Sequence, residues 1–113
     1  MNIIKIIPAT EDKRVIYKLT KSKSTSVKDL EPDSVITPVR YCIFEDTNSK
    51  GEENTVLCIE DSSGETFSTI SKTFTRDFEE VAALMEDEAY QIKVINGTTK
   101  AGRPFVTCEL VCD

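Results

Sequence analysis

Short stretches of alternating apolar and polar residues dominate the chain, and each of them predicts a β-strand. The run from 34 to 46 is the longest, and Pro38 within it predicts a bend or bulge. The polar stretch 21–26 predicts a loop that separates an amino-terminal strand pair from the rest. The expected strands are 2–7, 14–19, 34–46, 54–60, 65–70, 90–95 and 103–112.

One segment, 71–88, changes from a period of two to the 3.6-residue period of a helix. Phe74, Phe78, Val81 and Leu84 recur at helical spacing, while acidic residues occupy the other positions. Thr75 is the expected N-cap. The apolar face is better explained by packing against a sheet than by a binding stripe, because Phe74 and Phe78 share it with aliphatic residues.

From residue 34 the order is three strands, a helix and two strands, which is the order of an OB-fold. We therefore predict a mostly β, single-domain protein over 1–113. It would be an OB-fold-like five-stranded barrel with one amphipathic helix between strands three and four. Residues 1–33 would form an extension that carries the amino-terminal strand pair. The two loops that flank an OB-fold ligand face carry cations here, at Lys50 beside Gly51 and at Lys100 and Arg103 around Gly102.

The 113 residues include no His, which excludes Ser-His-Asp and Cys-His relays and any His-ligated metal. The expectation is a non-enzymatic protein without cofactor or metal. A nuclease that uses Asp, Glu and Mg²⁺ is a distant alternative, because the carboxylates do not form a spaced group on strands.

The cysteines and the amino terminus bear on the compartment. Cys42, Cys58, Cys108 and Cys112 contain no C-x-x-C pair and favour reduced structural thiols, with a disulfide or metal site as the lesser alternative. The apolar amino terminus is too short for a signal peptide, and no run could span a bilayer. A soluble, cytoplasmic protein with no membrane partner is expected.

The net charge of −6 argues at first against a polyanionic partner. However, residues 1–28 contain seven bases and two acids, a net of +5, and much of the acid lies on the expected helix. A cationic groove can therefore coexist with the negative total.

Aromatic rings on strands are candidates for stacking bases of a single strand. Tyr41 and Phe44 lie on opposite faces of the first barrel strand, and alternation does not decide which ring faces outward. Tyr90 and Phe105 are expected in the core, whereas the sequence leaves open whether Tyr17 lies in the core or on the surface.

Residues 52–113 resemble the single-stranded-DNA-binding proteins of small phages that replicate linear genomes by protein priming, in particular the Bacillus phage type. The motifs are Glu53-x-Thr55-Val56, Ser63-Gly64-x-x-Phe67-Ser68-x-Ile70-Ser71-Lys72-Thr73, and Lys93-Val94-x-x-Gly97-Thr98 followed by Lys100-x-Gly102-x-x-Phe105. The resemblance implies a viral early protein in the host cytoplasm that coats displaced strands during DNA replication. It places family tyrosines at Tyr41 and Phe67, and Asn48 replaces a third.

The prediction is therefore sequence-independent binding of single-stranded DNA. Tyr41 and Phe67 would stack bases, and Lys21 and Lys23 would close over the strand. Either Phe44 or Tyr17 would substitute for the missing loop ring, or binding would be weaker. A replication polymerase is a further candidate partner, and the protein would be a monomer or associate weakly on DNA. The alternative is a small acidic module that binds a host protein through its helix. The residues expected to neutralise phosphates are Arg40, Lys50, Lys72, Lys100 and Arg103.

Overall fold

Eight strands and two α-helices form the fold of the computed structural model, which describes residues 1–86 and 88–112. Residue 87, near the end of the helix expected over 71–88, lies outside the described residues. A 3-10 turn, η1, covers Val27–Asp29. The helices are α1 (Lys13–Thr20) and α2 (Lys72–Met85). The strands are β1 (Asn2–Ile7), β2 (Thr25–Ser26), β3 (Val35–Ile36), β4 (Pro38–Thr47), β5 (Glu53–Asp61), β6 (Thr66–Thr69), β7 (Ile92–Thr98) and β8 (Pro104–Leu110).

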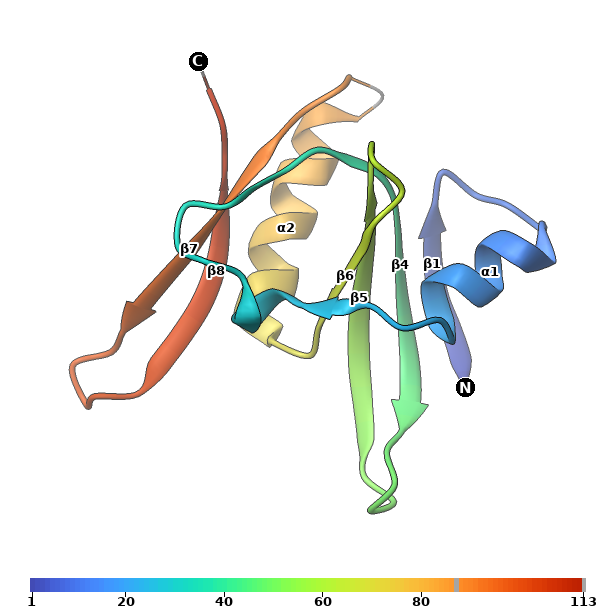
Figure 1. Ribbon diagram of the computed structural model, residues 1–113, viewed down its shortest axis with the longest axis horizontal. Helices are drawn as coiled ribbons and strands as arrows, with labels where there is room; N and C mark the ends of the chain where they lie inside the picture. Colours follow the sequence, from blue (N-terminus) through green and yellow to red (C-terminus); the bar gives the residue numbers. More distant parts are fainter. Residues whose placement is uncertain (87, 113) are drawn as a thin grey trace.

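The strands form two sheets in a single compact globule with extents of 41 × 39 × 22 Å. One sheet has the order β1-β4-β5-β6-β2, and the other has the order β3-β7-β8. Figure 1 shows α2 between the two sheets, with the β4–β5 turn projecting at the bottom of the view and the β7–β8 turn at the lower left. The mostly β class and the order from the long first strand to the last are confirmed.

The predicted bend near Pro38 is confirmed, and it lets one stretch of chain serve both sheets. Before the bend, β3 pairs with β7, and after it β4 pairs with β5. The β4–β5 register shifts between Pro38 and Arg40, which is the irregularity expected where proline interrupts a ladder.

The expected barrel is not closed by strand pairing among the described residues. β6 pairs with β5 on one side and, in parallel, with β2 on the other, whereas β8 pairs with β7. Most of the stretch 21–26 is loop as expected, but its end forms β2 and occupies the edge of β6. Val27 follows directly and is fully buried in the core. The amino-terminal segment thus fills the side on which the barrel would close.

The prediction of an amino-terminal strand pair is wrong for the second strand, because residues 13–20 form helix α1. Asp12 caps this helix, and its Oδ1 accepts a hydrogen bond from the Arg14 N–H at 2.9 Å. Val15 and Leu19 are four residues apart and therefore share one helix face. That face packs on Phe44 and other residues of the sheet, and burial of this helix face outweighs the β-propensity of the Val15-Ile16 pair.

Helix α2 lies within the predicted segment 71–88, but its N-cap is Ser71 and not Thr75. The Ser71 Oγ accepts a hydrogen bond from the Phe74 N–H at 3.1 Å. Phe74 and Phe78 are fully buried, which confirms the core-packing interpretation for these two rings, whereas Leu84, expected on the same face, is exposed. The ring of Phe78 meets the ring of Tyr41 edge-on, with centroids 4.9 Å apart, and lies 6.5 Å from that of Tyr90. Tyr90 is therefore structural, as expected.

Candidate nucleic-acid interface

The three rings expected to stack bases are all buried. Tyr41 and Phe67 belong to the main core under α2, and Phe44 belongs to a second cluster on the opposite face of the sheet. A ring with no open face cannot accept a base, so the stacking role assigned to these residues is corrected. Tyr41 and Phe44 are buried because both faces of β4 are covered, one by α2 and the other by α1. Phe67 of β6 is buried in the same core as Phe74 and Phe78 of α2.

The face of β4 and β5 that carries Phe44 is turned away from α2, and α1 fills its centre. Cys42, Phe44 and Cys58 pack there against Leu19, with Val15 at the margin. The surface offered to a ligand on this side is therefore the exposed side of α1 and not the sheet itself.

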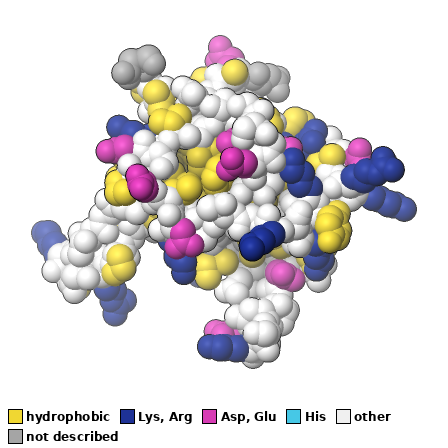
Figure 2. Space-filling model, in the orientation of Figure 1, with side chains coloured by type: hydrophobic (Ala, Val, Ile, Leu, Met, Phe, Trp, Pro, Cys, Tyr) yellow, Lys and Arg dark blue, Asp and Glu magenta, His cyan; other side chains and the backbone are white. Residues whose placement is uncertain are grey.

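The exposed side of α1 combines one aromatic ring with several cations. Tyr17 is 63% exposed. Lys13 and Lys21 lie four residues before and after it, and Arg14 lies three residues before it, so all three cations are on the same side of the helix as the ring. We call these four residues the cationic face. The sequence contains no acid from 13 to 28. Figure 2 shows Lys and Arg side chains gathered at the right of the molecule, over α1. Of the predicted residues, Lys21 belongs to this face.

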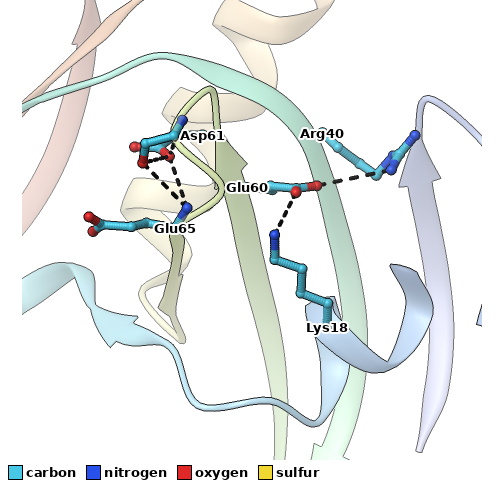
Figure 3. Close-up of polar contacts among 6 residues, drawn as sticks. Lys18, Arg40, Glu60, Asp61 and Glu65 are labelled. Carbon is cyan, nitrogen blue, oxygen red and sulfur yellow. Dashed lines mark hydrogen bonds and ion pairs between the residues drawn. The ribbon is translucent and has the colours of Figure 1, made fainter. Parts of the chain in front are cut away.

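Arg40 lies beside this helix and shares a carboxylate with Lys18 (Figure 3). The Lys18 Nζ donates to the Glu60 Oε2 at 2.8 Å, and the Arg40 Nη1 lies 4.0 Å from the Glu60 Oε1. Among the residues that the structure describes, the Arg40 Nε finds no hydrogen-bond partner. Arg40, a predicted phosphate contact, is thus half-buried, and the same carboxylate partly neutralises Arg40 and Lys18.

A polar hollow of about 360 Å³ opens next to Lys18, between the end of α1 and the β5–β6 turn. The turn is ordered by Asp61, whose carboxylate accepts hydrogen bonds from Ser63 and from the Glu65 N–H (Figure 3). Lys23, one of the predicted DNA-binding residues, lines this hollow. The lining residues of the hollow are Lys18, Ser22, Lys23, Thr25, Gly64, Glu65 and Thr66.

The other predicted cations lie at the far end of the sheets. Lys50 is in the β4–β5 turn, Lys72 opens α2, and Lys100 and Arg103 are in the β7–β8 turn, all exposed. The predicted set therefore divides between two regions and does not form one groove. Asn48 shapes the β4–β5 turn by accepting hydrogen bonds from the Lys50 and Glu52 N–H groups at 2.9 and 3.0 Å.

Phe105, expected in the core, is 40% exposed on β8 and is the ring that the sequence argument missed. It lies over Gly97 so closely that a Cβ there would be 2.4 Å from the Phe105 Cζ. Alternation could have indicated this exposure, because Cys108 faces the core and Phe105 has the opposite parity. Lys100 and Arg103 flank it in a hairpin with no acid from 94 to 108.

All four cysteines are free thiols, as expected, and three of them are buried. Burial raises the pKa of Cys42 to about 11 and the pKa values of Cys58 and Cys108 to about 12. The thiolate is the reactive form, and Cys112 is exposed.

A thiol-reactive disulfide reagent at pH 8 should therefore modify one thiol per chain in the folded protein and all four in denaturant. The released thiolate can be counted by absorbance. Cys112→Ser is the control and should abolish the fast phase. Rapid reaction of two or more thiols in the folded protein would contradict the buried positions.

Two classes of feature are absent from the described residues. They contain no group of three or more His, Cys, Asp or Glu side chains placed to hold a metal ion. Neither α1 nor α2 is long and apolar enough to cross a membrane.

Comparison of the chain with protein-family models, curated proteins and solved structures finds no match.

Proposed function

We propose that this protein binds single-stranded DNA without sequence preference and coats strands displaced during phage replication. The observation that carries the proposal is the exposed Tyr17 ring at the centre of the cationic face. Stacking on an exposed ring along a cationic track holds a single strand without reading its sequence, because every base has a π-face. The coating role is the one implied by the resemblance to phage proteins.

A second exposed ring supports the same proposal at the other end of the molecule. Phe105 combines with Lys100 and Arg103 on the β7–β8 hairpin. We propose that the fold is an open relative of the OB-fold, in which loops at both sides of the ligand face contact the strand. The helix α1 would replace the exposed sheet as the centre of that face.

The net charge of −6 is compatible with this proposal because the two helices lie on opposite faces of the sheet. Leu19 of α1 packs beside Cys42, whereas Phe78 of α2 packs on Tyr41, the next residue of the same strand. The acids Glu79, Glu80 and Glu86 are therefore separated from the cationic face by the sheet.

A titration with poly(dT) and with duplex DNA at several salt concentrations tests the proposal. If about six phosphates are neutralised, log affinity should fall with log salt at a slope of about −4, at roughly −0.7 per phosphate. Fluorescence anisotropy of a labelled oligonucleotide measures this slope. An affinity that does not respond to salt would remove the cationic face as the binding surface.

Absence of any binding to poly(dT) would favour the alternative, an acidic module that binds a protein partner. Leu84 supports that alternative, because it is 73% exposed on α2 next to acidic residues. A stoichiometric protein complex that depends on Leu84 and Glu80 would then be expected in place of a DNA complex.

A further inference from the structure

We propose that the polar hollow between α1 and the β5–β6 turn binds one phosphodiester group of the strand, and that Glu60 competes with it. This inference rests on the proposed function and assigns a specific site to it. Every lining residue is polar or glycine, so the hollow offers no apolar wall to a base. Its chemistry instead suits a tetrahedral anion.

The donors around the hollow come from one continuous stretch of the chain, residues 18–25. Lys18, on α1, and Lys23, in the loop that follows, supply two ammonium groups, and the hydroxyls of Ser22 and Thr25 lie in the same wall. Ammonium and hydroxyl donors together satisfy several phosphate oxygens, and contacts with an ionised partner are the strong ones. A volume of about 360 Å³ admits a phosphate together with part of its sugar.

The opposite wall is formed by Gly64, Glu65 and Thr66 at the β5–β6 turn, and Gly64 contributes no side chain to it. Gly64 has a φ of +90°, a conformation that glycine adopts without strain, and Lys18 Nζ lies 3.7 Å from the position that a Cβ would occupy. The Asp61 carboxylate is already engaged by Ser63 and by the Glu65 backbone. In Figure 3 the Glu65 carboxylate points away from Lys18.

Glu60 is the group that opposes a phosphate here. Its carboxylate accepts a hydrogen bond from the Lys18 Nζ at 2.8 Å and lies 4.0 Å from the Arg40 guanidinium. A phosphate that reaches Lys18 must share it with this carboxylate and is also repelled by it. Removing the charge of Glu60 should therefore strengthen binding of the strand, whereas removing Lys23 should weaken it.

The decisive comparison is Glu60→Gln against Glu109→Gln. Each substitution removes one carboxylate charge that is paired with lysine, but the Glu109–Lys93 pair, at 3.4 Å, lies on the other sheet. At low salt, Glu60→Gln should bind oligo(dT) about three- to fivefold more tightly than the wild type, a change in the range of an exposed ion pair. Glu109→Gln should bind like the wild type, and Lys23→Gln should bind about threefold more weakly.

A second measurement locates the contact and identifies the source of the phosphate. In amide NMR spectra, oligo(dT) and millimolar inorganic phosphate should both shift residues 22–25 and 64–66, and Lys23→Gln should abolish the phosphate shifts. Tighter binding of inorganic phosphate than of oligo(dT) would identify a site for free phosphate and overturn the assignment to the strand. Phosphate shifts elsewhere would overturn the site itself.

Failure of this inference can be distinguished from failure of the proposed function. If the wild type does not bind oligo(dT), both the proposed function and the phosphate site in the hollow are wrong. If oligo(dT) binds but Glu60→Gln and Glu109→Gln have equal affinities, only the hollow is excluded. Thermal melting of each variant shows whether it is folded, and Glu60→Gln retains a side chain that can accept the hydrogen bond from Lys18.

Discussion

Phe78→Ala is expected to lower the free energy of unfolding by about 3–5 kcal/mol, the usual cost of removing a buried phenylalanine ring. Phe78 is fully buried and supports the ring of Tyr41 across the interface between α2 and the sheet. The loss combines the burial of the ring with the cavity that it leaves. Because domains of this size are stable by about 5–15 kcal/mol, the variant should unfold at much lower urea concentration. Circular dichroism in a urea series measures the change.

Leu84→Ala is the matched control on the same helix. Its side chain is exposed, so the change should remain within about 0.5 kcal/mol. Equal losses for Phe78→Ala and Leu84→Ala would mean that the face of α2 described here is not the one packed on the sheet.

Tyr17→Ala should weaken binding of oligo(dT) by about 1–3 kcal/mol, because one base loses its stacking partner. The stability of the protein should stay close to that of the wild type, since the ring is exposed. Anisotropy titrations at one fixed salt concentration measure the affinity, and urea unfolding confirms the fold. Wild-type affinity in a folded Tyr17→Ala protein would contradict stacking on this ring.

Tyr17→Phe separates the ring from its hydroxyl group and from its fluorescence. The chain has three tyrosines and no tryptophan, and Tyr41 and Tyr90 are at least partly enclosed by the core. Quenching of tyrosine emission by poly(dT) should therefore come from Tyr17. In Tyr17→Phe the quenching should disappear while the affinity is retained. Persistent quenching would place the strand beside another tyrosine.

The sequence predicted most of the strands because each has a local cause, such as the interruption at Pro38 or the turn at Gly64. It did not predict α1, because Val15-Ile16 is typical of a strand and the Asp12 cap was not recognised. A further signal was present in the long first strand. Residues 41–44 are all apolar, and an uninterrupted apolar run indicates a strand that is covered on both faces. Such a strand requires a second cover, which α1 provides.

The same coverage explains why the site was only partly predicted. The cations Lys21 and Lys23 were assigned correctly to the surface, because charged side chains rarely lie inside a protein without a partner. The rings Tyr41 and Phe67 were misplaced, because an aromatic residue on a strand suits both a core and a stacking surface. Which of the two it serves depends on what covers the strand, and this is decided by segments distant in sequence. Phe105 was misplaced for the same reason. It lies on the face of β8 opposite to Cys108, which faces the core, and the ring is therefore exposed.

The position of β2 at the edge of β6 has a consequence for how the chain folds during synthesis. β1 pairs with residues 41–45, β2 with residues 67–68, and β3 with residues 92–93, so each early strand waits for a partner made much later. Contacts between distant residues slow folding because a long loop must close before any contact forms. β1 should therefore stay unpaired on the ribosome until residue 45 has emerged, β2 until residue 68 has emerged, and β3 until the last hairpin emerges.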